Sequence, residues 1–189
     1  MHRASKHFRV GPIPLYALGA IFLVPLSIGV LLVNANANAN DRANQLSRDT
    51  ASMYAQGMDF SRIDNRNIAL NAAEGLGVNL RTGAGVVILS KIRMVQASDC
   101  EVMATCVNQG YPVVTQRYVI GNADLRTSSL ATPNIIDLST GNVQNWLSDP
   151  SARAKDFHQK LKAGEFSYVA ECYLKSPDSH GGIYSRTIF

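Results

Sequence analysis

The residues of this chain with the clearest capacity for covalent chemistry are its three cysteines. Cys100 and Cys106 stand between two predicted strands, and the alternatives for them are a redox pair, two metal ligands or a structural bridge. The spacing is not that of a CxxC motif, and no histidine lies nearby to complete a zinc site. In an oxidising compartment the pair predicts a disulfide that closes its loop. Cys172 falls on the apolar side of another predicted strand, where we expect a buried free thiol.

The other reactive residue types form no catalytic pattern. Asp178-Ser179-His180 contains the residue types of a hydrolase triad, but adjacent residues rarely reach that geometry, and a turn is favoured. Gly83-Ala84-Gly85 and Gly181-Gly182 lack the spacing of a phosphate-binding loop. No cluster of carboxylates suggests a metal site or a glycosidase pair. We therefore expect a protein that is not an enzyme and needs no cofactor or metal.

The distribution of charge argues against nucleic acid as a partner. The chain of 189 residues has a net charge of +4, and Arg3, Lys6 and Arg9 precede its first acidic residue. The remainder of the chain is therefore close to neutral. A nucleic-acid-binding domain concentrates basic residues on its folded surface, where they neutralise phosphates. Here the excess lies on a short N-terminal tail.

An uncharged segment near the N-terminus predicts a membrane span. Leu15–Val33 reads LYALGAIFLVPLSIGVLLV, and a helix of that length approaches the ~30 Å of a hydrocarbon core. Only a helix satisfies its own backbone in lipid. The positive residues precede the span, which predicts a cytoplasmic N-terminus and an exported remainder. The alternative is a cleaved signal peptide, for which Ala35-Asn36-Ala37 offers a cleavage site.

Helical periodicity continues beyond this segment. Apolar or small residues alternate at spacings of three and four, at Ala43, Leu46, Thr50, Met53, Gly57 and Phe60. The pattern predicts a helix that continues from the span and packs one side against a domain or a neighbouring subunit. A second helix is predicted over Asn65–Leu76, with Ile68, Ala72 and Leu76 on its buried side.

The periodicity then changes to two, which predicts strands. The predicted strands are Val86–Met94, Tyr111–Ile120, 166–175 and Ile183–Phe189. The first has one buried face, because Lys91 and Arg93 occupy alternate positions on the other. The second places Val114, Tyr118 and Ile120 on one face.

One more helix is predicted between the strands. Asp149 is a suitable N-cap and Pro150 suits a first turn. Its buried side is predicted at Ala154, Phe157 and Leu161, and Gly164 is predicted to end it. The order of elements predicts an α+β fold, in which a transmembrane helix continues into a polar helix and a small antiparallel sheet carries one or two packed helices. The expected parts are a basic cytoplasmic leader (1–14), a transmembrane helix (15–33), a helical stalk (34–80) and an extracytoplasmic α+β domain (81–189).

Three stretches match a family pattern. They are Phe22-Leu23-Val24-Pro25-Leu26 with Gly29, the strand Val86–Ile92, and Tyr168–Leu174 followed by Ser176-Pro177. With the basic leader and the polar helix, the chain resembles the TadE/TadG-like proteins of tight-adherence (Flp-type) pilus systems. The resemblance implies a pilin-like fold and a pseudopilin-like or minor-pilin role in bacterial pilus assembly, without enzymatic activity. It also implies a single-pass protein of the bacterial inner membrane with a periplasmic or extracellular domain.

The same resemblance implies the partners: the lipid bilayer, and other pilus or pseudopilin subunits reached through the N-terminal helix. The assembly positions would be Pro25, Gly29, Leu46, Met53 and Phe60. A prepilin processing site has a glutamate five residues after its glycine, whereas here Gly11 is followed at that position by Tyr16. An anchor that stays uncut is therefore favoured.

A different class of function stays open. The exported part would be a signal-anchored or secreted binding module, such as a sensor or adhesin domain. Binding residues concentrate in loops, so its ligand site would be formed by Gln96–Tyr111 and Gly121–Pro133.

Overall fold

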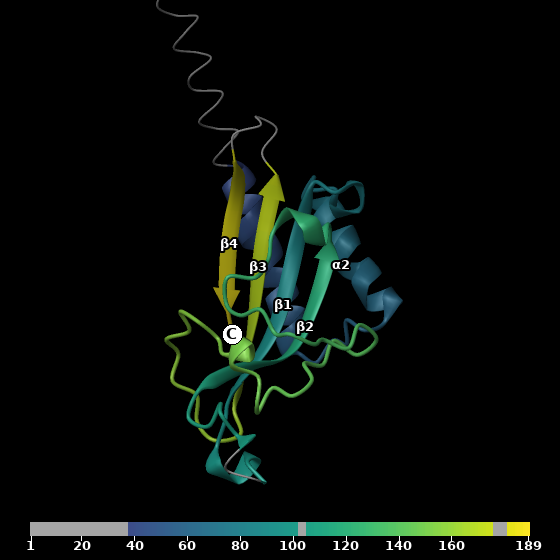
Figure 1. Ribbon diagram of the computed structural model, residues 1–189. Coiled ribbons are helices and arrows are strands. Elements are labelled where there is room, and N and C mark those ends of the chain that lie inside the picture. Colours follow the sequence, from purple (N-terminus) through teal and green to yellow (C-terminus); the bar gives the residue numbers. More distant parts are fainter. Residues whose placement is uncertain (1–37, 102–104, 176–180) are drawn as a thin grey trace, which may run out of the picture. The chain divides into compact units, whose positions relative to one another are not determined.

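The computed structural model describes residues 38–101, 105–175 and 181–189, and residues 39–189 form one compact unit. A four-stranded antiparallel sheet with the order β2-β1-β3-β4 is its centre (Figure 1). The strands are β1 (Gly85–Met94), β2 (Pro112–Gly121), β3 (Phe166–Lys175) and β4 (Gly182–Ile188). The predicted α+β class and antiparallel sheet are confirmed.

The predicted membrane span over 15–33 lies outside the described residues. No helix within the described ranges combines the length and the apolar content that a bilayer span needs.

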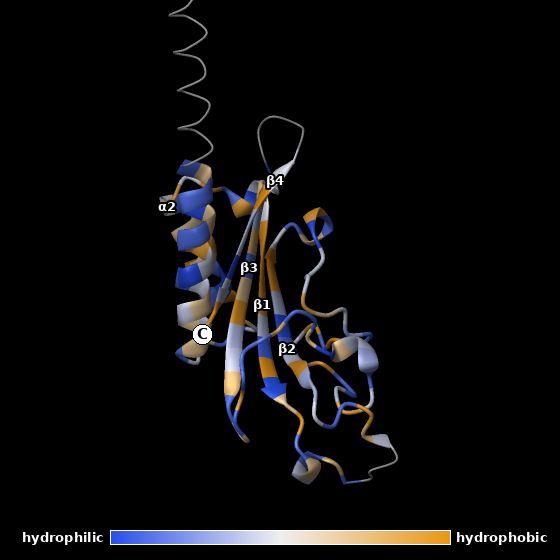
Figure 2. Cartoon of the chain, turned by 90° about the vertical axis from the view of Figure 1, so that its left-hand side faces the viewer, coloured by the Kyte–Doolittle hydropathy of each residue, from blue (hydrophilic) through white to orange (hydrophobic). Residues whose placement is uncertain are grey.

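Two helices lie on one side of the sheet, and long loops lie on the other (Figure 2). The first is helical over the described residues 38–55, and the second is α2 (Ile63–Gly75). Ala43 and Leu46 of the first helix are fully buried in a core that includes Val87 and Leu89 of β1. The first part of the predicted stripe is thus packed against the sheet of the same chain, but the helix ends at residue 55. Gly57, which is exposed, and Phe60, which is buried, lie in the connection beyond it.

Hydroxyl groups hold the first helix on strand β4. The Ser47 Oγ lies 3.0 Å from the Ser185 Oγ and 2.8 Å from the Thr187 Oγ1. The Ser185 hydroxyl also donates to the Asn44 Oδ1 at 2.6 Å. Small polar residues at these positions let the helix approach the strand closely while every buried hydroxyl keeps a partner.

The buried side of α2 differs from the prediction. Ala69 and Ala73 are buried, whereas Ile68 is 44% exposed. Alanine at both contact positions lets the helix backbone approach the core more closely than isoleucine would, and close packing decides the rotation of the helix. The helix ends before Gly77, whose φ of 73° is the left-handed conformation common after helices.

A register shift in β2 corrects the predicted face of Val114. Lys91 of β1 pairs with Gln116, but Ile92 pairs with Val114, so Thr115 is an extra residue in β2. A bulge of this kind turns the following side chains to the opposite face. Tyr118 and Ile120 therefore face the helices, while Val114 packs in the core on the other side of the sheet.

The sheet is buried on both faces, although the sequence predicted one buried face for β1. The long segment between β2 and β3 covers the second face and contributes Leu130, Ala152 and Phe157 to a core with Ile92 and Val169. The sequence of the segment between β2 and β3 has no periodic pattern that predicts its packing on the sheet. Ser90 is fully buried on this face, and its hydroxyl accepts a hydrogen bond from the buried Arg117.

The predicted helix from Asp149 to Gly164 is not formed. Only a short 3-10 helix, η5 (Pro150–Ala152), follows the Asp149 cap, whose side chain accepts from the Ser151 amide. The amide of Ala154 donates to the Pro112 carbonyl at 2.8 Å, and that of Lys155 to the Leu130 carbonyl at 2.6 Å. Pairing with β2 and with a loop takes the amides that a helix would use, so Phe157 is buried from a non-helical segment.

A buried polar cluster connects this covering segment to the sheet. Glu171 of β3 accepts hydrogen bonds from the Ser128 hydroxyl, the Ser129 amide at 2.8 Å and the Tyr184 hydroxyl at 2.8 Å. The Arg117 guanidinium donates to the Ser128 Oγ at 3.0 Å. The carboxylate and the guanidinium therefore share one serine hydroxyl and have no direct ion pair.

The hydrogen bonds keep Glu171 ionised. Burial by itself would raise the pKa of Glu171, but the bonds from Ser128, Ser129 and Tyr184 outweigh it and hold the pKa below its ordinary value. Burial lowers the pKa of Arg117 to about 10, which still leaves it charged at neutral pH. The covering segment is thus attached to the sheet by hydrogen bonds to two oppositely charged side chains, Glu171 and Arg117.

Candidate functional site

The loop between β1 and β2 is closed by a disulfide. Cys100 and Cys106 are paired at disulfide distance, with their Cα atoms 5.6 Å apart. Asp99 holds the start of the loop, since its carboxylate accepts from the Gln96 amide at 2.8 Å and from the Arg93 Nη2 at 2.7 Å. The predicted pairing of the two cysteines is confirmed, and Cys172 is a buried free thiol as expected.

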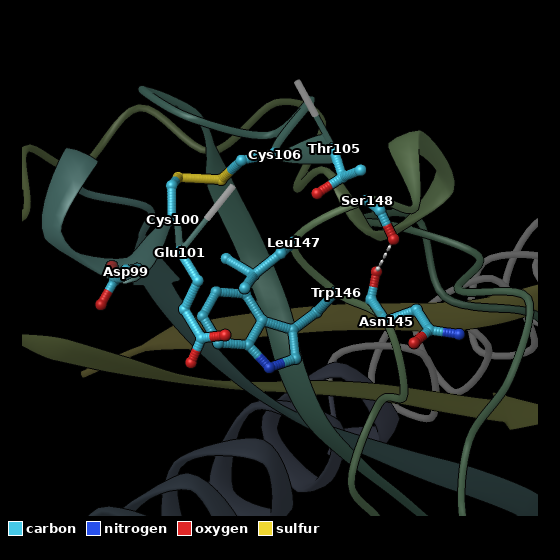
Figure 3. A pocket seen from close by; sticks show the side chains of 9 residues that line it. All are labelled: Asp99, Cys100, Glu101, Thr105, Cys106, Asn145, Trp146, Leu147 and Ser148. Carbon is cyan, nitrogen blue, oxygen red and sulfur yellow. Dashed lines mark hydrogen bonds between the residues drawn. A yellow bond between two sulfur atoms is a disulfide. The ribbon is translucent and has the colours of Figure 1, made fainter. Parts of the chain in front are cut away.

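A cavity of about 390 Å³ lies beside this disulfide, which we name the disulfide cavity (Figure 3). Its lining residues are Asp99, Cys100, Glu101, Thr105, Cys106, Asn145, Trp146, Leu147 and Ser148. Asn108, which is fully buried, connects the two loops by donating to the carbonyls of Trp146 and Asp149, both at 2.7 Å. The predicted ligand loop 96–111 thus meets residues 145–148, whereas loop 121–133 is used to cover the sheet.

A second cavity of about 360 Å³ lies at the end of the sheet, and we name it the Lys91 cavity. Its lining residues are Lys91, Arg93, Thr115, Gln116, Asn142, Val143, Trp146 and Phe166. The strands continue past the ends of the helices (Figure 2). Trp146 lines both cavities.

Two cations are stacked on aromatic rings in the Lys91 cavity. The Lys91 ammonium lies 4.0 Å from the Phe166 ring centre, and the Arg93 guanidinium lies 5.3 Å from that of Trp146. Arg93 is partly neutralised by Asp99, but its Nε is buried without a hydrogen-bond partner. Among the described residues no carboxylate pairs with Lys91. The cavity therefore holds an excess of positive charge in fixed positions.

Two tyrosine hydroxyls contact Gln116 of the Lys91 cavity but are not acids or bases at neutral pH. Tyr54 donates to the Gln116 Oε1 at 2.8 Å, and Tyr118 donates to the Asp59 Oδ1 at 3.2 Å. Burial raises the pKa of Tyr118 to about 12, and it raises that of Tyr54 further. Tyr54 donates to the Gln116 side chain, whereas the Tyr118 hydroxyl accepts from the Gln116 Nε2 at 2.9 Å, so the two neutral hydroxyls hold this side chain in place.

The structure places the predicted assembly residues as follows. Leu46 and Phe60 are fully buried in the core of their own domain, and Met53 is half-buried against it. Pro25 and Gly29 lie outside the described residues, as do Asp178, Ser179 and His180. In the described ranges, no three His, Cys, Asp or Glu side chains are grouped to hold a metal ion.

The residues of the Lys91 cavity were not identified as a site from the sequence. The alternation in β1 marked Lys91 and Arg93 as facing outward, and this was the available signal. Trp146 and Asn142 belong to a loop distant in sequence, and it reaches β2 through the bridge between Gln116 and Asn142. Only the tertiary structure brings these residues together.

We expect peptide mapping without reduction to link Cys100 to Cys106 and to leave Cys172 unmodified. Burial raises the pKa of the Cys172 thiol to about 12, so alkylation of the native protein at pH 8 should be negligible and should become complete in denaturant. Cys106→Ser should lower the free energy of unfolding by about 2–3 kcal/mol, because the closed loop is short. A Cys172 linkage to either loop cysteine would contradict the pairing.

Comparison with known proteins assigns no relative. No family model, no curated protein and no solved structure matches this chain.

Proposed function

We propose that the chain is a membrane-anchored, non-enzymatic component of a bacterial Flp-type pilus assembly system, of the pseudopilin-like or minor-pilin kind. The resemblance of its sequence to the TadE/TadG-like proteins supports this role. The arrangement of the domain agrees with it, because a helix that lies along a small antiparallel sheet is a pilin-like arrangement.

The observation that carries the proposal is the short distance in sequence between the predicted span and the folded domain. The predicted span ends at Val33, and the first helix is already formed at residue 38. The chain from Val33 to residue 38 spans no more than about 18 Å even when fully extended. Ala43 and Leu46 then belong to the domain core. A span over 15–33 would thus hold the domain directly at the membrane surface, where neighbouring membrane-borne subunits are within reach.

The proposed placement is the bacterial inner membrane, with one pass, a cytoplasmic N-terminus and a periplasmic or extracellular domain. The charge asymmetry around Leu15–Val33 supports this orientation. The disulfide supports an oxidising compartment for the domain. Because Leu46 and Phe60 are buried, contacts with other subunits are assigned to the apolar segment around Pro25 and Gly29.

Deleting the gene from its native host should remove or strongly reduce the pili recovered by shearing. The full chain should restore them, while a form exported by a cleavable signal and lacking 15–33 should not, because it cannot join subunits in the membrane. Immunoblots of the sheared fraction and electron microscopy provide the measurement. Carbonate extraction is the control: the full chain should stay with the membrane and the truncated form should be released. Normal pili in the deletion strain would contradict the assembly role.

The cavities around Trp146 favour a second candidate, an extracytoplasmic binding module. Their volumes of about 390 and 360 Å³ are within the range of small-molecule sites. This candidate predicts intact pili in the deletion strain and a saturable ligand response of the isolated protein.

A further inference from the structure

We propose that the Lys91 cavity binds one carboxylated sugar unit, a uronate, of an acidic polysaccharide. The inference goes beyond the assembly role and does not depend on it. It rests on the Lys91 cavity alone, because the disulfide cavity is lined by two carboxylates, Asp99 and Glu101, which would repel an anion.

The charge of the cavity selects an anionic ligand. Lys91 is held over Phe166 at 4.0 Å and over Tyr168 at 5.6 Å, so its ammonium is positioned before a ligand arrives. Its three donors have no carboxylate partner in the described ranges. Arg93 adds a second cation, whose single carboxylate partner is Asp99. A carboxylate placed at Lys91 would form the charge-assisted hydrogen bonds that the cavity lacks.

The remaining lining residues suit a sugar ring. Phe166 is 40% exposed and lines the cavity with Trp146. Lys91 lies over the Phe166 ring and Arg93 over the Trp146 ring, so the C–H groups of a sugar would pack against the ring surface that these cations leave open. Asn142 and Gln116 place amide groups at the rim, and the Gln116 side chain is fixed by bonds to Tyr118 and Thr140. Fixed polar groups beside aromatic rings give orientation and specificity to a small site.

The size and shape favour a sugar unit over an acidic protein partner. A volume of about 360 Å³ accommodates one ring-sized group, whereas a stable protein interface covers a much larger and flatter area. An acidic peptide would satisfy the charge of Lys91 but would leave the aromatic surface unused. An acidic peptide is therefore the competing ligand in the test below.

The full chain in neutral detergent should bind a short oligogalacturonate and show a saturable change in tryptophan fluorescence. Trp146 is the only tryptophan of the chain and lines both cavities, so the Lys91 variants assign the fluorescence signal to the Lys91 cavity. Lys91→Met keeps an unbranched side chain and removes the charge, and it should weaken binding by about tenfold or more. Lys91→Arg, which keeps the charge, should retain most of the affinity.

Arg126→Met is the matched control. Arg126 also stacks on a ring, 4.2 Å from the centre of Tyr184, but it lines neither cavity. Its removal lowers the net charge equally and should leave the affinity nearly unchanged. Equal loss in both variants would show non-specific attraction and overturn the site.

Three further arms decide the chemistry of the ligand. The methyl ester of the same oligosaccharide should not bind, and an equal response to it would overturn carboxylate recognition. Hexaglutamate should bind more weakly, and equal binding would replace the sugar with an acidic peptide. The absence of any saturable change with oligogalacturonate would overturn the proposal. Because the assay uses isolated protein, a normal or defective pilus phenotype leaves its result unaffected.

Discussion

Replacing Phe60 by alanine should lower the free energy of unfolding by about 3–5 kcal/mol, the range for a fully buried aromatic side chain. Phe60 has no exposed surface. Its ring centre lies 6.0 Å from that of Tyr54 in an edge-to-face arrangement and 6.1 Å from that of Tyr118. The ring thus joins the first helix, the connection to α2 and strand β2. Denaturant unfolding of the full chain in neutral detergent, followed by Trp146 fluorescence, provides the measurement.

Ile63→Ala is the control for Phe60→Ala. Ile63 is close in sequence but 66% exposed, so its truncation should change stability by less than about 0.5 kcal/mol. A loss below about 1 kcal/mol for Phe60→Ala would mean that the aromatic cluster collapses around the missing ring, and that it does not anchor the helices to the sheet.

Replacing Glu171 by alanine should also destabilise the protein, by about 3–5 kcal/mol at neutral pH. The substitution leaves the Ser128, Ser129 and Tyr184 donors without their acceptor. It also leaves the charge of Arg117 buried without a nearby carboxylate, since Arg117 is only 7% exposed. Glu74→Ala provides the control, because the Glu74–Arg81 pair is solvent-exposed and contributes less than about 1 kcal/mol.

The Glu171 contribution should depend on pH in a defined direction. Its folded-state pKa is lower than its unfolded value, although burial opposes this, because hydrogen bonds favour the carboxylate. The stabilisation is therefore complete above the unfolded pKa of about 4.3 and is lost as the pH falls through the lower folded value. The stability difference between wild type and Glu171→Gln should narrow in that acidic window. A difference that stayed constant to pH 2 would contradict the ionised state of Glu171.

The elements with a strong local pattern were predicted well. Alternation placed β1 and β3 within one residue of their observed bounds, because one side of each strand is largely apolar. In β3 that side faces the helices, and in β1 it includes Ile92 and faces the other core. The pattern of spacing three and four in the first helix identified Ala43 and Leu46 as buried. The six-residue separation of Cys100 and Cys106, together with an expected oxidising compartment, predicted their pairing. In each case the deciding interaction repeats along a short stretch of chain.

The wrong predictions share a different cause. Val114 lies on the face opposite to the predicted one because β2 contains an extra residue. That extra residue has no signature in the sequence. Residues 153–165 have helical periodicity but form an irregular segment with turns, since the amides of Ala154 and Lys155 pair with distant carbonyls. Ile68 of α2 faces outward because the small side chain of Ala69 packs better. Tertiary contacts outweighed a local preference at each position.

The sequence by itself determined the class of the fold, the positions of its strands along the chain, the disulfide pair and the near-neutral charge of the folded part. These properties follow from composition and from short-range periodicity, which depend only on residue types and on residues close together in sequence. Only the tertiary structure decided that a loop covers the second face of the sheet, and that Trp146 meets Lys91 and Phe166. Such contacts depend on which distant segments compete best for the same buried surface and the same backbone hydrogen bonds, and a one-dimensional pattern does not contain that comparison.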